Sequence, residues 1–341
     1  MKGKATSFDI AHYAGVSQST VSRALRNSPL VNEETRKRVF EIAKKLNYKV
    51  DKNASNLRTQ QSSTLALLLF EDPTSDESQI NPFFLSMLGS ITRACAKEGY
   101  DLLVSFQSAS ADWHADYEDS HRADGIILLG YGDYIDYQPK FDSLLAQNTK
   151  FVCWGANVDN RPDLTVCCDN VGGGQQAANH FIAQNRTDCA FIGDASHHSP
   201  EFFARFQGFK AQLAANNITL NERKMANAIS TEESGYHATR SLIANNITFN
   251  ALFAASDLIA IGAIRALKEA GIHVPNDVAV IGFDNIAIAS YTNPPLTTIE
   301  QNTTLAGQML VANLLKLIRG EHVQSTLLPP SLIVRGSSVH V

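Results

Sequence analysis

Apolar positions follow two different patterns along the 341-residue chain, and the change falls near residue 63. In the first fifty residues, apolar side chains recur every three or four positions, which is the spacing of one face of a helix. This spacing predicts two short helices broken at Gly15, followed by a third helix from near Asn32 to Leu46. Gly15 can adopt a left-handed turn, and Ser17 can cap the second helix. The pattern is that of a helix-turn-helix.

Polar side chains mark the start and the outer face of these helices. Thr6, followed by Asp9, predicts a capped start for the first helix. In the second helix, Val21, Ala24 and Leu25 form the apolar stripe, so the remaining positions face outward. These outward positions are polar and partly basic: Gln18, Ser19, Ser22, Arg23 and Arg26.

Beyond residue 63, unbroken apolar runs alternate with amphipathic stretches. The apolar runs predict buried strands of parallel sheets, and the amphipathic stretches predict helices that cover both faces. The strands fall into two sets, which predicts two α/β subdomains with a ligand cleft at the carboxyl ends of their strands. A last strand is predicted within 331–338. The other predicted strands are 65–70, 101–106, 125–129, 150–154, 189–193, 251–255 and 278–283, and the predicted helices include 83–98, 171–184, 201–215, 232–245 and 257–270.

Charge is distributed unevenly along the chain. Residues 1–61 hold twelve Lys and Arg against five Asp and Glu, a formal charge of +7. The rest of the chain holds seventeen against twenty-nine, a formal charge of −12. A basic head on an acidic body suits binding of a polyanion at one end only.

Nothing in the sequence predicts export or membrane insertion. The start, Met1–Lys4, is not followed by an apolar run, and no stretch approaches about 18 apolar residues. The five cysteines are odd in number and contain no Cys-x-x-Cys pair, which favours reduced thiols. We therefore expect a cytoplasmic, nucleoid-associated protein.

Ordered runs of residues in both parts of the chain form a long signature. In the head they are Asp9–Ala11, Ala14–Ser17, Thr20–Leu25, Val31, Thr35–Arg36, Val39 and Leu46–Tyr48. In the body they include Asn81–Phe84, Asp124–Ile127, Asp169–Asn170, Arg205, Gly208–Phe209, Asp257, Val274–Val278, Gly282–Asn285 and Pro295–Ile299. Together these runs resemble the LacI/GalR (lactose/galactose repressor) family of bacterial transcription factors, over nearly the whole chain.

The resemblance implies an α/β architecture in which a three-helix, helix-turn-helix head precedes a body with the fold of periplasmic sugar-binding proteins. The body would consist of two doubly wound parallel-sheet subdomains joined by three crossovers. The implied divisions are a DNA-binding head at 1–50, a hinge at 51–63, a head-proximal subdomain at 64–163 with 293–322, and a distal subdomain at 164–292 with 323–341.

The outer face of the second helix is predicted to contact DNA. Arg23 can form two hydrogen bonds to guanine, a contact worth about 1–3 kcal/mol of discrimination. Gln18 and Ser19 lie at the start of the helix, where the family reads bases, and their side chains suit base edges. Other residues suit phosphate contacts, which set register without reading sequence: Ser17, Thr20, Ser22, Thr35 and Arg36.

Residues 51–63 are polar apart from Leu57, and by themselves they are typical of a linker. In the family this segment is a hinge helix that forms on DNA and enters the minor groove. The resemblance implies that Leu57 is the wedge that kinks the central base step. Ala54 would be small enough to lie against the groove floor, and Arg58 would lie near a phosphate.

The resemblance places effector contacts at Arg205 and Asp257. Asp257 follows a predicted strand and opens a helix, so we expect its carboxylate at the cleft mouth, where it can accept from ligand hydroxyls. The guanidinium of Arg205 can donate hydrogen bonds to hydroxyls or to a carboxylate. An interdomain salt bridge between Arg205 and Asp257 is the alternative. Glu201 and Ser199 are weaker candidates.

Aromatic residues are the second part of the predicted effector site. Phe83 fits an apolar platform beside the first strand, although a core position is the alternative. Tyr131 and Trp154 end strands, where aromatic faces can stack on a sugar or a base. Trp154 and Ser230 depart from the family: an acidic residue is often found at the first position, and well-known members carry an aromatic at the second.

Other motifs in the sequence are weaker indications of a function. Gly172–Gly174 resembles a phosphate loop but lacks the Lys-Ser/Thr that should follow, so a helix N-terminus is favoured. His197 and His198 are adjacent, point apart and seldom share a metal, which favours a loop. No nucleophile and base appear in a known catalytic arrangement. We predict no catalytic residue, metal or cofactor.

The leading hypothesis is a homodimeric, ligand-responsive regulator, most simply a repressor, that binds a pseudo-palindromic operator. A sugar or sugar derivative is the favoured effector, and a nucleobase or nucleoside is the alternative. A solute-binding protein would have a similar body, but the basic head and the absence of a signal peptide argue against it. An enzyme on the same fold lacks a catalytic constellation. The final strand is not followed by a heptad helix, so a dimer is favoured over a tetramer.

Overall fold

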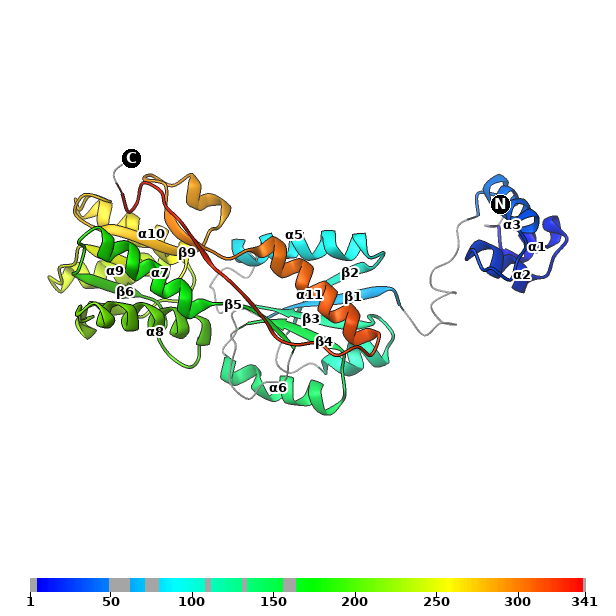
Figure 1. Cartoon of the computed structure of the whole chain (residues 1–341), viewed down its shortest axis with the longest axis horizontal. Coiled ribbons are helices and arrows are strands. Elements are labelled where there is room, and N and C mark those ends of the chain that lie inside the picture. The colour runs from blue at the N-terminus through cyan, green and yellow to red at the C-terminus, as the bar shows by residue number, and fades with distance from the viewer. Residues whose placement is uncertain are drawn as a thin grey trace. The chain divides into compact units, whose positions relative to one another are not determined.

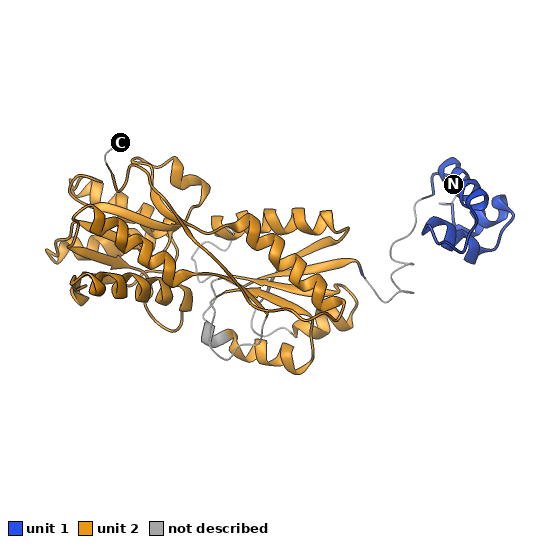
Figure 2. Ribbon diagram, in the orientation of Figure 1, with its two compact units in different colours: residues 1–62 blue, residues 63–341 orange. Residues whose placement is uncertain are grey.

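The computed structural model describes residues 5–48, 62–70, 80–107, 112–130, 134–155 and 164–339. These residues form two compact units, 1–62 and 63–341 (Figure 2). The second unit begins one residue before the start predicted from the sequence. Among the described residues, none of the helices combines the length and the apolar character needed to cross a membrane.

The first unit contains the three predicted helices, α1 (Ser7–Ala14), α2 (Gln18–Leu25) and α3 (Glu33–Lys45). Thr6 and Asp9 form a capping box at the start of α1, and these hydrogen bonds lower the pKa of Asp9. The helix ends at Gly15, whose φ of 63° is the left-handed conformation that glycine tolerates best. Ile10, Val21 and Val39 are fully buried at the centre of the bundle. The helix-turn-helix prediction is confirmed.

The second unit is built on two six-stranded sheets (Figure 1). The first sheet has the order β11-β5-β4-β3-β1-β2, and its strand pairs are parallel. Its strands are β1 (Thr64–Phe70), β2 (Asp101–Gln107), β3 (Gly125–Leu129), β4 (Phe151–Trp154), β5 (Thr165–Cys168) and β11 (Thr326–Leu328).

The second sheet has the order β12-β10-β9-β8-β6-β7 and is parallel except where β12 pairs with β10. Its strands are β6 (Cys189–Ile192), β7 (Met225–Ala226), β8 (Ala251–Ala254), β9 (Ala279–Asp284), β10 (Thr297–Glu300) and β12 (Ser331–Ile333). We call the sheets, with the helices packed on them, the first and second subdomains.

Helices cover both faces of each sheet. On the first sheet, α5 (Pro82–Lys97) and α11 (Thr303–Ile318) pack side by side, while α6 (Tyr134–Ala146) and the short π-helix His114–Asp119 belong to a separate apolar cluster on the other face. On the second sheet, α7 (Asn170–Ala183) pairs with α8 (Pro200–Ala215), and α9 (Glu232–Ala244) pairs with α10 (Asp257–Glu269). Two 3₁₀ turns, Glu222–Lys224 and Ala287–Ser290, complete the regular structure. The predicted α/β architecture is confirmed.

The chain crosses between the sheets three times, as expected, but at later points than predicted. The crossings follow Cys168, Glu300 and Leu328, whereas the predicted boundaries lie at 163/164, 292/293 and 322/323. Strands β5, β10 and β11 therefore belong to the opposite sheet from the predicted one. Apolar pattern identifies a strand, but both sheets bury their strands alike, so pattern cannot assign a strand to a sheet.

Candidate functional site

Helix α2 presents a polar face on the surface of the head. Val21 and Ala24 bury the inner face of this helix, which leaves Ser19 and Arg23 exposed on the outside. Gln18, at the first position of α2, is half-buried and donates from Nε2 to the Ser7 hydroxyl at 3.3 Å. The exposed guanidinium has the reach and the donors for a base edge in the major groove.

Several of the predicted phosphate contacts already make hydrogen bonds within the head. The Ser17 hydroxyl accepts from the Thr20 backbone at 3.2 Å, which confirms the predicted cap, and lies 2.8 Å from the Thr20 hydroxyl. The Ser22 hydroxyl accepts from Arg26 at 3.1 Å. Thr35 and Arg36 are half-buried in the first turn of α3. Their roles toward DNA stay predictions. The hinge residues Ala54, Leu57 and Arg58, and the effector candidate Tyr131, lie outside the described residues.

A buried charged site lies at the carboxyl ends of the strands of the second sheet. Arg205 projects from α8, and its side chain is 1% exposed. It donates from Nε to Asn170 Oδ1 at 2.9 Å and from Nη1 to the Ala255 carbonyl at 2.6 Å. Nη1 also lies 3.6 Å from Oδ1 of Asp284, whose side chain is equally buried. The guanidinium stacks 3.8 Å from the centre of the Phe283 ring.

The topology explains why these groups meet. Asp284 ends β9, Ala255 follows β8 and Asn170 opens α7, so all three lie where parallel strands end. Gln301, in the second crossing, donates to Asp284 Oδ1 at 2.7 Å. The site therefore links the ends of the strands to a connection between the subdomains.

Asp284, Asn170 and Gln301 were not among the predicted site residues. Asp284 carries part of the signal that selected Asp257, namely a carboxylate that follows a predicted apolar strand. Its φ of 114° is rare for a residue with a side chain and often marks a functional site. Asn170 lies in a run that carries the family resemblance, but the resemblance did not single it out as a site residue, and no sequence pattern marks Gln301. The roles of both residues depend on the crossings between the sheets.

The expectation that the Asp257 carboxylate lies at the cleft mouth is wrong, because the residue is fully buried. Oδ2 accepts from the Ile286 backbone at 2.8 Å, and Oδ1 accepts from the Thr298 hydroxyl at 2.5 Å. Burial and the neighbouring Asp284 raise the pKa of Asp257 well above its usual range. The alternative of an interdomain bridge with Arg205 is also wrong, since both residues belong to the second subdomain and the carboxylate facing Arg205 is that of Asp284.

Three further effector candidates, Phe83, Trp154 and Ser230, are buried. Phe83 is 1% exposed and packs 6.0 Å from the buried Trp154 ring, which supports the core alternative. The Ser230 hydroxyl bonds to Ser256 at 3.0 Å and accepts from Asn81, at the start of α5, at 3.2 Å. This last contact joins the two subdomains.

Two weaker candidates lie near the start of α8. Ser199 donates to Asp194 at 2.8 Å. The Glu201 carboxylate reaches toward Gly155 of the first subdomain, where an added Cβ would meet Oε1 at 3.5 Å. Binding of an effector by any of these side chains stays a prediction.

Gly172–Gly174 belongs to the first turn of α7, as the favoured alternative predicted. Asp169 caps this helix by accepting from the Gly172 backbone at 2.8 Å, and its carboxylate would repel a phosphate.

His197 lies in a turn against the Phe203 ring. Burial raises the pKa of the Cys167 thiol to about 11 and that of Cys168 to about 12, so both stay protonated near neutral pH. Among the described residues, no group of His, Cys, Asp and Glu is arranged to hold a metal.

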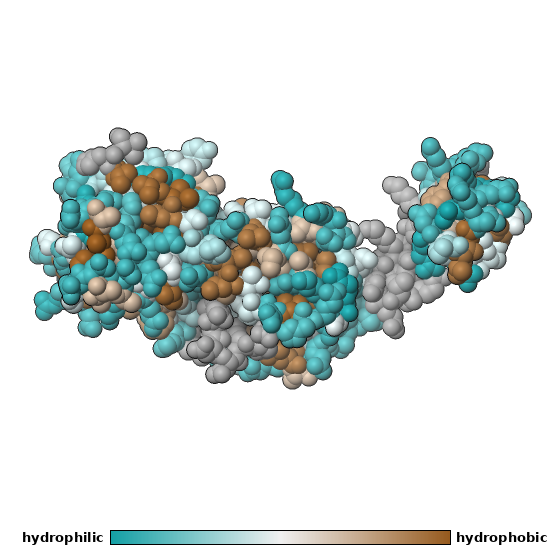
Figure 3. Space-filling model, in the orientation of Figure 1, coloured by the Kyte–Doolittle hydropathy of each residue, from teal (hydrophilic) through white to brown (hydrophobic). Residues whose placement is uncertain are grey.

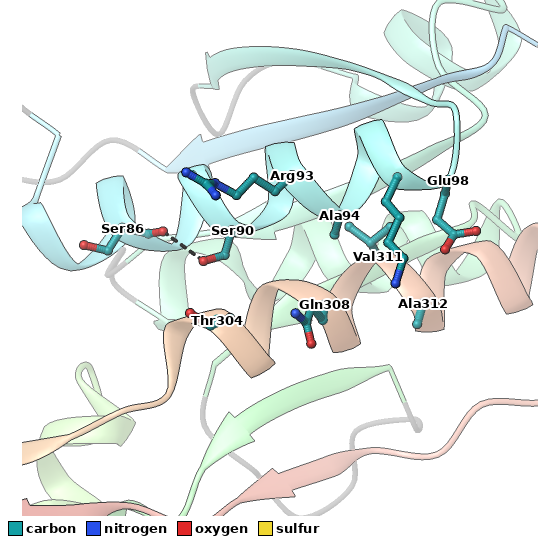
Figure 4. A pocket seen from close by; sticks show the side chains of 11 residues that line it. Ser86, Ser90, Arg93, Ala94, Glu98, Thr304, Gln308, Val311 and Ala312 are labelled. Carbon is teal, nitrogen blue, oxygen red and sulfur yellow. Dashed lines mark hydrogen bonds between the residues drawn. The ribbon is translucent and has the colours of Figure 1, made fainter.

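A separate groove of about 660 Å³ lies between α5 and α11 (Figure 4). Its lining mixes polar and small apolar residues, with Ser86, Ser90 and Arg93 from α5 facing Thr304 and Gln308 from α11. None of the predicted effector residues lines it, and it lies on the first subdomain. The groove is therefore not the predicted effector site, in spite of its volume.

Two family models match the chain. Residues 8–51 match the model described as bacterial regulatory proteins, lacI family, and residues 178–338 match the periplasmic binding protein-like domain. The chain is 32% identical over 317 residues to the probable HTH-type transcriptional repressor ExuR of Bacillus subtilis, covering 91% of this chain and 90% of that protein. It is 30% identical over 318 residues to the HTH-type transcriptional regulator AscG of Escherichia coli, covering 92% of each.

Solved structures of transcriptional regulators also resemble this chain. The lac repressor dimer bound to operator and the anti-inducer ONPF superposes with a TM-score of 0.84 at 26% identity, covering 99% of this chain and all of that one. A complex of the transcriptional regulator CelR with cellobiose superposes with a TM-score of 0.73 at 28% identity, covering 98% of this chain and all of that one.

Proposed function

Because the chain belongs to the lacI family of bacterial regulatory proteins and is a ligand-responsive transcriptional repressor, we propose that it binds a pseudo-palindromic operator as a homodimer and takes a sugar-like effector at the Arg205–Asp284 site. The observation that carries this proposal is the buried pair Arg205 and Asp284, held at the carboxyl ends of parallel strands in a chain whose head exposes a basic α2. Such a chain senses a ligand and regulates transcription, and its relatives are transcriptional regulators.

The charge balance of the site supports a neutral, hydroxylated effector. Asp284 balances the Arg205 charge, so binding an anionic ligand would leave a net buried charge. Guanidinium donors beside carboxylate and amide oxygens suit hydroxyl groups, which both donate and accept. The CelR neighbour, solved with cellobiose, supports the same class. Stacking on a sugar or a base is predicted for Tyr131 and Trp154. Tyr131 lies outside the described residues, and the Trp154 ring is buried beside Phe83, so it offers no open face to a nucleobase.

Exposed apolar residues support dimerisation through the first subdomain. Strand β2 is an edge strand of its sheet, and Val104 and Phe106 on it are 41% and 52% exposed. Leu85, on the neighbouring helix α5, is 54% exposed. Polar residues cover much of the visible face of the body, with apolar areas between them (Figure 3). An uncovered edge strand invites pairing with another chain, and a second copy would cover it.

Two measurements test the proposed function. Gel shifts against palindromic sequences from the upstream region of the neighbouring genes should show a dimer-sized complex whose affinity falls steeply with salt. A thermal-shift panel of glucose, galactose, cellobiose, glucuronate, adenine and guanosine should give the largest shifts with neutral sugars. Binding that does not depend on salt would contradict the head assignment, and a shift with glucuronate alone would contradict the effector class.

Replacing Arg23 by alanine should remove sequence discrimination rather than binding in general. The exposed guanidinium is the candidate for guanine, and its loss should cost about 1–3 kcal/mol on the cognate operator and little on random DNA. Arg36→Ala is the matched control. Loss of a phosphate contact should weaken binding to the cognate operator and to random DNA equally, and it should lower the salt dependence of binding. Equal losses on both DNAs in Arg23→Ala would assign this side chain to phosphate.

Replacing Leu57 by alanine should weaken the operator complex without changing effector affinity. The predicted wedge opens a base step, and its removal forfeits the DNA bend and the contacts that the bend permits. Gel shift measures the first quantity and calorimetry with the best panel sugar the second. An unchanged operator affinity would exclude the wedge.

A further inference from the structure

The turn that carries Asp284 has an unusual backbone. Asp284 has φ of 114° and Asn285 has φ of 52°, so two consecutive residues with side chains occupy the left-handed half of conformational space. Such conformations persist only where the surroundings hold them. Something must therefore fix this turn if the Asp284 carboxylate is to face Arg205.

Asp257 holds the turn from α10. Its Oδ2 accepts from the Ile286 backbone at 2.8 Å, just after the two unusual residues. Its Oδ1 accepts from the Thr298 hydroxyl at 2.5 Å, and that hydroxyl in turn accepts from the Asn285 backbone at 3.3 Å. One buried carboxylate thus fixes two successive amides of the turn, one directly and one through Thr298.

Arg335 holds the same turn from the C-terminal segment. Its Nη2 donates to Asn285 Oδ1 at 2.7 Å, and its Nη1 donates to the Leu296 carbonyl at 2.7 Å. Asn285 also donates to Glu300 at 2.9 Å. The turn is therefore held by α10, by the C-terminal segment and by β10.

The surroundings of Asp257 leave no room for a ligand atom at its carboxylate. A Cβ at Gly282 would lie 2.3 Å from Oδ1, so the β9 backbone closes one side. Both carboxylate oxygens have protein donors, and the residue is fully buried.

We propose that Asp257 is a positioning residue for the effector site: it holds the turn 284–286 so that Asp284 faces Arg205, and it does not itself contact the effector. This inference rests on the proposed function, which places the effector at Asp284. It replaces the direct contact that the sequence suggested for Asp257.

Hydrogen–deuterium exchange of the full-length protein tests the holding role without any effector. In Asp257→Ala the peptide covering 284–290 should exchange about tenfold faster or more, while peptides of β6 and β8 stay as protected as in the parent. Thr298→Val removes the bridging hydroxyl and should show the same localised change, and it serves if Asp257→Ala fails to fold. Asp277→Ala is the matched control, since this exposed carboxylate accepts from the His273 backbone away from the turn. Unchanged exchange of the turn in both test variants would overturn the proposal.

Calorimetry with the panel sugar that gives the largest thermal shift tests the link to Asp284. Asp257→Ala should weaken binding about tenfold alone but cause no further loss when Asp284→Ala is already present, because it acts through that side chain. Additive losses would mean that Asp257 contacts the sugar and would overturn the proposal. If Asp284→Ala alone leaves affinity unchanged, the proposed effector site fails, while the exchange result still decides whether Asp257 holds the turn.

Discussion

Replacing Arg205 by methionine should abolish the thermal shift caused by the effector and lower the free energy of unfolding of the body by about 3–5 kcal/mol. Methionine keeps most of the length of the side chain but removes the guanidinium charge and its donors. Asp284 then stays buried without its cation, and Asn170 and the Ala255 carbonyl lose a donor. Urea unfolding followed by circular dichroism measures the stability, and the sugar panel measures binding.

Arg265→Met is the control for this change. Arg265 lies in the same subdomain, pairs with Glu232 at 2.9 Å and stacks on Tyr236, but its side chain is 48% exposed. Surface pairs of this kind contribute about 1 kcal/mol or less. Arg265→Met should therefore unfold close to the parent and bind the sugar normally. An Arg205→Met protein that keeps full sugar binding would move the effector site elsewhere.

The head could be predicted from sequence because each of its features is local. Capping by Thr6 and Ser17, the left-handed Gly15 and the helical spacing of Val21 and Ala24 involve neighbours within a few positions. Local chemistry of this kind is visible in a sequence without knowledge of the fold.

The body could be predicted in class but not in detail. Long apolar strands such as β1 and β3 were found, whereas the two-residue β7 and the three-residue β11 are too short to show a pattern. Helix α11 is apolar over much of its length, and its period is obscured because it packs against both the sheet and α5. The crossings after Cys168 and Glu300 depend on which sheet accepts a strand, and that choice involves residues far apart in the sequence.

The ligand site shows the same division between local and distant information. Arg205 was found, and it lies at the centre of the site. The carboxylate predicted to share the effector site with it was that of Asp257 rather than Asp284, although both residues come after apolar strands. The sequence offers two carboxylates in equivalent places, and only the direction of each side chain decides between them. Asp257 turns into the core beneath the turn that follows β9, and Asp284 turns toward Arg205.

The position of Arg205 depends on how closely α7 and α8 approach each other. A Cβ at Gly208 of α8 would lie 2.0 Å from the Val171 carbonyl oxygen, and one at Gly174 of α7 would lie 2.1 Å from the Arg205 carbonyl oxygen. Both obstacles are backbone atoms, which cannot move aside as the end of a side chain can. The two glycines therefore set the spacing that brings Asn170, on α7, to Arg205, on α8.

Replacing Gly208 by alanine should lower the free energy of unfolding by about 3 kcal/mol and weaken sugar binding as well, because the helices must separate to admit the methyl group. Gly89→Ala in α5 is the matched control: it makes the same change inside a helix, and the added Cβ meets nothing within 4 Å. Alanine there should leave stability unchanged or raise it by about 0.5–1 kcal/mol, since glycine is a poor helix former. Urea unfolding and calorimetry with the best panel sugar measure both quantities in both variants. If the two substitutions have equal effects, the close packing of α7 and α8 does not set the geometry of the site.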